Sequence, residues 1–145
     1  MDLVLRLHRE DRDIWNTYGP TETTVIVSGA TMSPEPPVRI GRPIPGWELA
    51  VVNPETEEPV SWGQRGELVV GGVGLGRYLD PELDARQYAP LPGLGWKRAY
   101  RTGDIVQAEP EGLIFVGRTD DQINLGGKRI ELGEVDDHIS RLPNV

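Results

Sequence analysis

The stretch NTYGPTE occupies residues 16–22 and brings an aromatic ring, a Gly-Pro turn and a carboxylate close together in the chain. A ring held on such a turn, here that of Tyr18, can stack on a planar base, which is worth roughly 1–3 kcal/mol per base. Thr21 offers a hydroxyl to a phosphate oxygen, and Glu22 offers the hard oxygen ligand that Mg²⁺ prefers. The stretch therefore indicates part of a nucleotide site. Taken alone, it also fits a β-turn with solvated Thr and Glu side chains, which is the less favoured alternative.

Three further stretches follow along the chain. YRTGD, residues 100–104, again combines a ring, a glycine turn and a carboxylate, and Asp104 can accept hydrogen bonds from both hydroxyls of a ribose. GRTDDQ, residues 117–122, supplies Arg118, whose guanidinium can add a charge-assisted bond to the same sugar. GGKRIELGE follows at residues 126–134. Considered singly, the carboxylate and the guanidinium fit a turn cap and a surface side chain equally well.

In this order the motifs resemble the adenylate-forming (ANL) superfamily, most closely the adenylation domains of nonribosomal peptide synthetases. The similarity covers residues 15–145. The resemblance implies that Tyr18 stacks on adenine and that Asn16 contacts the base. It also implies that Thr21 contacts the α-phosphate and that Glu22 binds Mg²⁺. These last two are therefore the candidate catalytic residues, and ATP and Mg²⁺ are the implied cofactors.

The resemblance assigns roles to residues of the later motifs as well. Asp104 and Arg118 become ribose ligands. Asp120 matches the hinge about which a small C-terminal domain rotates between two reaction steps, and a hinge residue acts by absorbing a change of backbone dihedral angle. Gly126 and Gly127 would let the chain pass close to an incoming pantetheine arm, because glycine has no Cβ. The same glycine pair also makes an ordinary hairpin turn.

A pocket for the carboxylic-acid substrate is a further implication of the resemblance. Thr17, Val25 and Ile26 occupy positions that line this pocket in the family. Val25 and Ile26 equally fit the core of an ordinary strand, and three residues are too few to name the acid.

The chain also departs from the family pattern. GVGLGRYL, residues 72–79, is one residue shorter than the usual Gly-x-Gly-x-Ala-Arg-Gly-Tyr-Leu, and Asn124 stands where many relatives have lysine. The Gly- and Ser/Thr-rich phosphate loop, the aspartate that holds a substrate ammonium and the C-terminal catalytic lysine of the family have no counterpart in the sequence. Without the loop and the lysine, most charge stabilisation of phosphoryl chemistry is missing. We therefore expect a fragment that is inactive by itself.

Turn residues are frequent, with 18 Gly and 13 Pro among 145 residues, and they favour many short strands in a small barrel or sandwich. Between 2 and 15 we expect a short strand followed by a polar loop. Further strands are predicted at 23–28, 47–52, 66–70, 99–102, 105–108 and 113–116.

Helices are expected at two places. Residues 81–87 can form one or two turns, with Asp80 as N-cap. After a hairpin formed by 122–125 and 128–130, the spacing of apolar residues predicts a helix over 132–142 that ends before Pro143.

The expected fold class is mainly β with an α+β portion. It would comprise the β-barrel subdomain of an adenylate-forming enzyme, a hinge, and the first hairpin and helix of the C-terminal α+β domain. The expected boundaries are 1–32 for the end of the α/β core with the adenine-binding motif, 33–117 for the β-barrel subdomain, 118–121 for the hinge and 122–145 for the start of the mobile C-terminal domain.

Bulk composition excludes several classes of function. The net charge of −8 leaves too few Lys and Arg to neutralise phosphates, so binding to nucleic acid is not expected. No apolar run reaches the ~18 residues of a membrane span, and no secretion signal is evident. The absence of cysteine rules out disulfides and thiolate metal sites and is compatible with the cytoplasm.

The resemblance thus implies part of an AMP-forming ligase. Its parent would activate a carboxylic acid, in the first place an amino acid, and pass it to the phosphopantetheine thiol of a carrier protein. An acyl-CoA ligase of the same superfamily is one alternative, although RIELGE at 129–134 favours the peptide-synthetase branch. A noncatalytic product of a truncated gene is the other.

Overall fold

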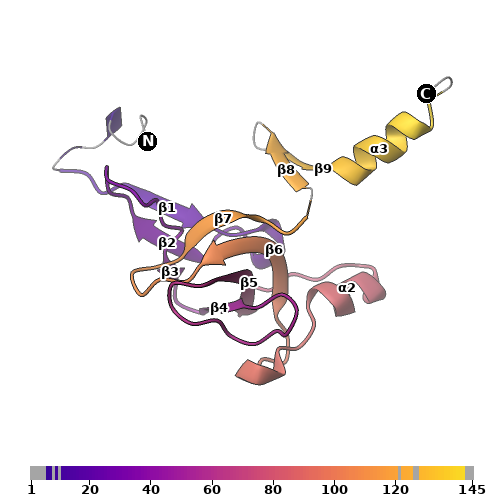
Figure 1. The fold of residues 1–145 in the computed structure, drawn as a ribbon, viewed down its shortest axis with the longest axis horizontal. Helices are drawn as coiled ribbons and strands as arrows, with labels where there is room; N and C mark the ends of the chain where they lie inside the picture. The colour runs from indigo at the N-terminus through magenta and orange to yellow at the C-terminus, as the bar shows by residue number, and fades with distance from the viewer. Residues whose placement is uncertain (1–5, 8, 10, 121, 126–127, 143–145) are drawn as a thin grey trace.

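A computed structural model describes residues 6–7, 9, 11–120, 122–125 and 128–142. Figure 1 shows two antiparallel sheets, with a terminal hairpin and helix that project away from them. The first sheet contains β1 (Trp15–Tyr18), β2 (Ser28–Thr31) and β3 (Arg42–Pro43) in that order. The second contains β4 (Trp47–Val52), β5 (Arg65–Gly72), β6 (Tyr100–Gln107) and β7 (Ile114–Arg118), also in chain order.

The smaller elements connect or follow these sheets. They are the 3₁₀ turns η1 (Thr21–Thr23) and η2 (Pro92–Leu94), the helix α2 (Pro81–Gln87), the hairpin of β8 (Gln122–Leu125) and β9 (Lys128–Glu131), and the helix α3 (Leu132–Ser140). The predicted mainly β fold with an α+β C-terminal portion is confirmed. Within the described residues, no helix has the length and apolar character needed to cross a bilayer.

Apolar side chains pack on both faces of the four-stranded sheet. Leu68 and Val70 of β5 lie in one cluster and Val69 lies in the other, as alternation along a strand requires. The first cluster also contains Val27, which immediately precedes β2, and Leu113, which precedes β7. This shared cluster packs the two sheets together.

A short backbone bridge also joins the two sheets. Gly41 pairs with Leu113 in an isolated antiparallel bridge, with N–H···O distances of 2.8 Å from Ile40 to Leu113 and 3.0 Å from Leu113 to Gly41. Gly41 has φ of +86°, and a Cβ there would lie 1.9 Å from the carbonyl oxygen of Gly29 in β2. Only glycine fits this position without displacing the backbone.

Several predicted elements are confirmed. β4 covers the predicted 47–52, and α2 covers the predicted 81–87. The side chain of Asp80 accepts hydrogen bonds from the backbone N–H groups of Glu82 and Leu83, so its predicted N-cap role is confirmed. The predicted hairpin is formed by β8 and β9.

The strand predicted at 23–28 is wrong. Residues 21–23 form η1, and β2 begins only at Ser28. Thr24 and Val25 have positive φ of 55° and 75°, which ends any extended run there in spite of the β-branched residues. The chain turns back on itself at this point, because the N–H of Val25 donates to the carbonyl of Pro20 at 3.4 Å. The tight turn therefore overrides the β propensity of these residues.

Two other expectations need correction. The strands predicted at 99–102 and 105–108 are a single strand, β6, which continues through Gly103 at φ of +71° and has a register shift between Ile105 and Val106. Arg6 and Leu7 are helical, so the described part of 2–15 does not show the strand expected there until β1 begins. Residues 2–5 lie outside the described residues.

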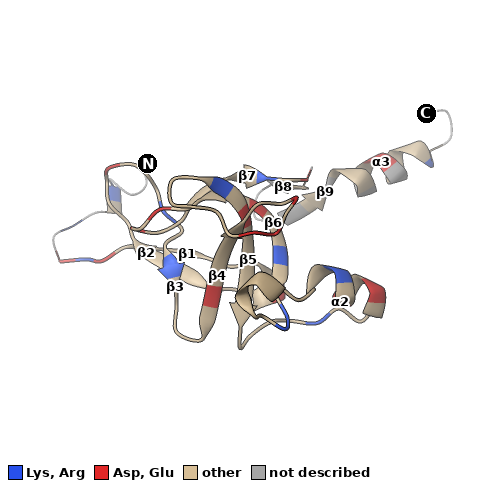
Figure 2. Cartoon of the chain, turned by 60° about the horizontal axis from the view of Figure 1, so that its bottom comes forward, with Lys and Arg blue, Asp and Glu red and all other residues tan. Residues whose placement is uncertain are grey.

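Figure 2 shows acidic and basic positions interspersed over the two sheets and α2. Ion pairs also join loop residues to other parts of the chain, for example Arg39 with Glu109 at 2.7 Å and Arg98 with Asp84 of α2 at 2.9 Å. Both pairs are partly exposed, so each contributes little to stability on its own.

Candidate functional site

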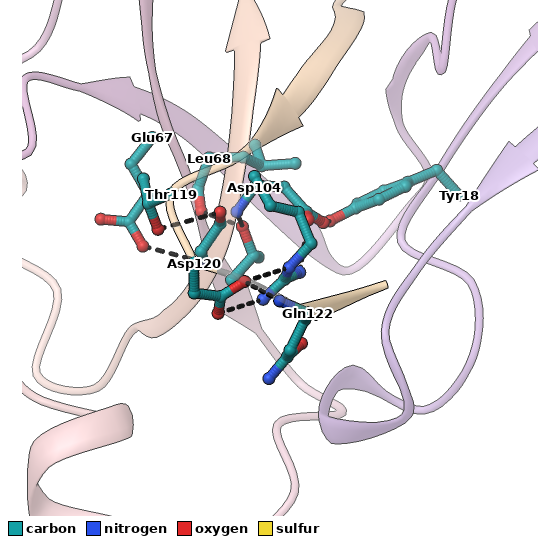
Figure 3. Close-up of polar contacts among 10 residues, drawn as sticks. Tyr18, Glu67, Leu68, Asp104, Thr119, Asp120 and Gln122 are labelled. Carbon is teal, nitrogen blue, oxygen red and sulfur yellow. Dashed lines mark hydrogen bonds and ion pairs between the residues drawn. The ribbon is translucent and has the colours of Figure 1, made fainter. Parts of the chain in front are cut away.

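Tyr18, at the end of β1, reaches across to the second sheet. Alternation along the strand places its side chain on the same face as that of Asn16 and opposite that of Thr17. Its hydroxyl donates a hydrogen bond to Oδ2 of Asp104 on β6 (Figure 3). Burial, reinforced by the neighbouring charge of Asp104, raises the pKa of Tyr18 well above its usual range. The phenol is therefore a hydrogen-bond donor throughout the physiological pH range.

Asp104 lies on the inward face of β6, where every second residue is buried, and only 7% of it is exposed. Its backbone N–H donates to Oγ1 of Thr102 at 3.0 Å, and its Oδ1 accepts from Nη1 of Arg118 at 2.5 Å. Burial raises the pKa of Asp104, and the hydrogen bond from Tyr18 and the charge of Arg118 offset this only in part. A carboxylate has about four acceptor positions, so this one can also accept from two sugar hydroxyls.

Arg118, the last residue of β7, joins Asp104 to Asp120. Its Nε and Nη2 donate to the two carboxylate oxygens of Asp120 at 2.7 and 2.8 Å, which is a bidentate pair (Figure 3). The hydrogen bond from Arg118 to Asp120 is the main reason why the pKa of Arg118 is raised. Thr119, which lies between Arg118 and Asp120 in the chain, donates to the carbonyl of Gly103 through its backbone N–H at 2.8 Å and its hydroxyl at 3.1 Å. The predicted hinge segment is thereby tied to the turn inside β6.

A polar cavity of about 220 Å³ opens beside this cluster. Its walls come from β5, β6, the end of β7 and the segment around Tyr78, and they include Glu67, Arg118 and Asp120. Ligand pockets usually occupy about 300–1,000 Å³. The cavity lined by these described residues is smaller than that range.

Glu67 is a carboxylate of this cavity that the sequence motifs did not indicate. Its Oε1 accepts from the N–H of Gly103 at 3.0 Å (Figure 3). Burial is the main cause that raises the pKa of Glu67, and the hydrogen bond from Gly103 and the charge of Arg101 act against it.

The raised pKa of Glu67 gives a testable pH dependence of stability. Stability from this group is fully present below its unfolded pKa of about 4.5 and is lost as the pH rises through the higher folded value. Glu67→Gln should therefore gain stability relative to the native chain between pH 4 and pH 7. Urea unfolding of both proteins at the two pH values measures this difference. A difference that stays constant, or one that reverses in sign, would contradict the assignment.

Glu22 lies in η1 and faces the segment that follows β5. Its Oε1 accepts a hydrogen bond from the hydroxyl of Tyr78 at 2.8 Å. Its carbonyl oxygen accepts from the backbone N–H of Gly76 at 2.7 Å and from the hydroxyl of Tyr88 at 2.9 Å. Burial, together with the hydrogen bond to Glu22, raises the pKa of Tyr78 to about 12. Since Tyr78 also lines the polar cavity, it connects Glu22 to the cluster around Arg118.

The remaining predicted residues lie outside this cluster. Asn16 donates through Nδ2 to the carbonyl of Arg39 at 2.7 Å, and Thr21 is exposed. Thr17 is exposed as well. Val25 and Ile26 are 66% and 39% exposed in the loop before β2, so they are not strand core.

Gly126 and Gly127 lie outside the described residues. The structure thus brings together Tyr18, Asp104, Arg118 and Asp120, and it links Glu22 to them through Tyr78. Sequence reasoning missed Tyr78, although it drew attention to the segment 72–79 that contains it.

The donor set for a divalent cation is small. Among the described residues, no group of three or more His, Cys, Asp and Glu side chains could hold a metal ion. Mg²⁺ is commonly bound by one or two carboxylates together with phosphate oxygens and water. Glu22 therefore fits a site that the phosphates of a nucleotide would complete.

These two sheets bring a phenol, a buried carboxylate and a guanidinium together from three different strands. The family model described as AMP-binding enzyme matches residues 2–78, and this chain belongs to that family. The predicted membership of the adenylate-forming superfamily is thereby confirmed.

Curated relatives match nearly the whole chain. Phosphinothricin tripeptide synthetase PhsC of Streptomyces viridochromogenes is 44% identical over 142 residues, covering 94% of this chain and 13% of that protein. Novobiocin biosynthesis protein H of Streptomyces niveus is 42% identical over 135 residues, covering 90% of this chain and 22% of that protein. Bacitracin synthase 3 of Bacillus licheniformis is 41% identical over 133 residues, covering 90% and 2%. The chain thus spans less than a quarter of each of these proteins.

Solved structures show the same fold. An NRPS protein containing adenylation and PCP domains, PA1221, has a TM-score of 0.84 at 30% identity, covering 97% of this chain and 30% of that chain. A four-domain nonribosomal peptide synthetase bound to AMP and glycine, AB3403, has a TM-score of 0.70 at 40% identity, covering 90% and 10%. The resemblance to the adenylation domains of peptide synthetases is confirmed by these similarities.

Proposed function

We propose that this chain is the part of an ATP-dependent adenylation domain that binds the adenosine end of the nucleotide and carries the hinge. The complete domain condenses a carboxylic acid, in the first place an amino acid, with ATP to give acyl-AMP and pyrophosphate. The acyl group then passes to the thiol of a phosphopantetheine arm on a carrier protein, releasing AMP. We place this reaction in the cytoplasm.

The observation that carries the proposal is the convergence of Tyr18, Asp104 and Arg118. These residues are far apart in sequence, yet a phenol and a guanidinium meet one buried carboxylate. Such a carboxylate suits the two hydroxyls of a ribose, and an adjacent phenol ring suits stacking on adenine. Asn16 lies on the same face of β1 as Tyr18 and is the proposed contact to the base.

In this proposal, the residues of the chain act by positioning the nucleotide and its metal ion. Thr21 is proposed to donate its hydroxyl to the α-phosphate, and Glu22 is the residue that would hold Mg²⁺, which neutralises phosphate charge when bound. Thr17, Val25 and Ile26 lie exposed beside this motif and are proposed to complete the acid pocket together with parts of the domain outside this chain.

The later residues serve the second step. Asp120 is the proposed hinge, and its bidentate pair with Arg118 restrains its side chain. Gly126 and Gly127 are proposed to border the path of the pantetheine arm. The names of the relatives favour the peptide-synthetase branch over an acyl-CoA ligase.

ATP–pyrophosphate exchange tests this function. We expect no exchange with the isolated chain, because the phosphate loop and the catalytic lysine are absent. Exchange should appear when the chain replaces the matching segment of the 40% identical synthetase that binds AMP and glycine, with glycine as substrate. In this chimera, AMP should protect residues 16–22 and 100–104 from hydrogen exchange.

Two outcomes would contradict the proposal. A folded chimera without exchange would mean that the chain cannot serve as part of an adenylation domain, as expected of a noncatalytic gene product. Exchange by the isolated chain with any amino acid would show that the missing parts are not required.

A further inference from the structure

Glu22 is held at two separate points by two tyrosines. The hydroxyl of Tyr88 and the backbone N–H of Gly76 both donate to its main-chain carbonyl, at 2.9 and 2.7 Å. These contacts fix the backbone of η1. The hydroxyl of Tyr78 donates to the side chain instead, at Oε1 and 2.8 Å. The first pair of contacts locates the residue, and the third sets the orientation of its carboxylate.

Tyr78 is itself held by a network of contacts. Its backbone N–H donates to Oδ1 of Asp84 at 2.8 Å, and Asp84 pairs with Arg98 at 2.9 and 3.1 Å. Arg98 also donates to the carbonyl of Gly76 at 2.7 Å and lies 4.0 Å above the ring of Tyr88. The backbone of Tyr78 is therefore fixed relative to both residues that hold Glu22 by its main chain.

The position of the Tyr78 hydroxyl is informative because it lies between two parts of the proposed site. Tyr78 lines the polar cavity together with Arg118 and Asp120, while its hydroxyl reaches Glu22. A hydrogen bond from a neutral hydroxyl to a carboxylate is charge-assisted. It can orient the carboxylate, which packing of the ring alone does not do. Removal of the hydroxyl alone would leave the ring contact with Tyr88, at 5.8 Å between centroids, in place.

We infer that Tyr78 is a positioning residue that holds the Glu22 carboxylate in the orientation needed at the metal–phosphate end of the nucleotide. This inference rests on the proposed function, in which Glu22 holds Mg²⁺. Tyr88 makes its bond to the main-chain carbonyl of the same residue, so the same Tyr→Phe substitution there removes a contact to Glu22 without touching its carboxylate and serves as the control.

The test uses Tyr78→Phe and Tyr88→Phe in the chimera with the AMP- and glycine-binding synthetase. Two affinities are measured by calorimetry for each folded protein: that for ATP in excess Mg²⁺, and that for AMP in the presence of EDTA. Tyr78→Phe should weaken the first about tenfold and leave the second unchanged, since a hydrogen bond to a charged group is lost. Tyr88→Phe should leave the ratio of the two affinities unchanged.

Glu22→Gln separates failure of this inference from failure of the proposed function. It should cause the same selective loss, and the double variant with Tyr78→Phe should lose no more than Glu22→Gln alone, because the two act through one interaction. If Glu22→Gln weakens metal-dependent binding and Tyr78→Phe does not, the positioning role is overturned. An equal loss of both affinities in Tyr78→Phe also overturns it. If Glu22→Gln has no effect, the proposed metal role of Glu22 itself fails.

Discussion

Asp104→Asn should lower the affinity of the complete adenylation domain for AMP about 100-fold. Hydrogen bonds to a charged group contribute about 1.5–3 kcal/mol each, and the proposed ribose contact provides two of them. A loss of about 3 kcal/mol corresponds to roughly two orders of magnitude in Kd. The amide keeps the size of the side chain, but it presents a donor where Tyr18 and Arg118 need an acceptor. Calorimetric titration of AMP into the chimera measures the effect.

Glu67→Gln is the matched control for Asp104→Asn. Glu67 is a partly buried carboxylate of the neighbouring strand, and it accepts its hydrogen bond from the backbone of Gly103 rather than from Tyr18 or Arg118. The glutamine keeps an acceptor for that bond, so AMP affinity should change less than about threefold, or about 0.6 kcal/mol. Equal losses in the two variants would mean that general polarity of the cavity, and not the carboxylate of Asp104, binds the sugar.

The elements that sequence alone predicted are those in which local and tertiary preferences agree. β4 carries a β-branched and aliphatic run bounded by turn residues, and α2 begins with an N-cap followed by proline. In each case the local signal and the final packing require the same conformation. When the two agree, the conformation of a short segment can be predicted from its own sequence.

The prediction failed where the surroundings decide the conformation. Residues 23–28 have high β propensity, but the close approach of Gly19 to Val25 requires a turn: a Cβ on Gly19 would lie 2.4 Å from the carbonyl oxygen of Val25. Gly103 had the opposite effect. It indicated a break between two strands, whereas β6 continues through it and only the register of its pairing with β5 shifts there.

The candidate site shows the same division. Tyr18, Asp104 and Arg118 belong to motifs whose order carries the information, and the structure brings them together. No motif order of this kind indicates a role for Tyr78. Its role depends on a contact with Glu22 across 56 positions of sequence, which no local pattern encodes. Only the packing of the 72–79 segment on η1 reveals it.

The contact between Tyr18 and Asp104 joins the two sheets, since one residue lies on β1 and the other on β6. It therefore depends on how the sheets are joined elsewhere. Gly41 lies at that junction, bridged to Leu113 on one side and in contact with the backbone of Gly29 on the other. The junction and the site are thus parts of one arrangement.

Gly41→Ala should destabilise the chain by about 4 kcal/mol. A left-handed conformation costs a non-glycine residue about 1–2 kcal/mol, and forcing an added methyl into a packed site costs about 1–3 kcal/mol more. Both terms apply here, because φ is +86° and the new Cβ would lie 1.9 Å from a carbonyl oxygen that belongs to a paired strand. Urea unfolding followed by circular dichroism measures the loss.

Gly63→Ala isolates the first of these two terms. Gly63 has a similar φ of +83°, but an added Cβ there would meet no atom within 4 Å. We expect it to cost only the conformational term of about 1–2 kcal/mol. In the chimera, Gly41→Ala should also weaken AMP binding, because separating the sheets parts Tyr18 from Asp104, whereas Gly63→Ala should not. Equal stability losses in the two variants would show that the bridge at Gly41 does not hold the sheets in register.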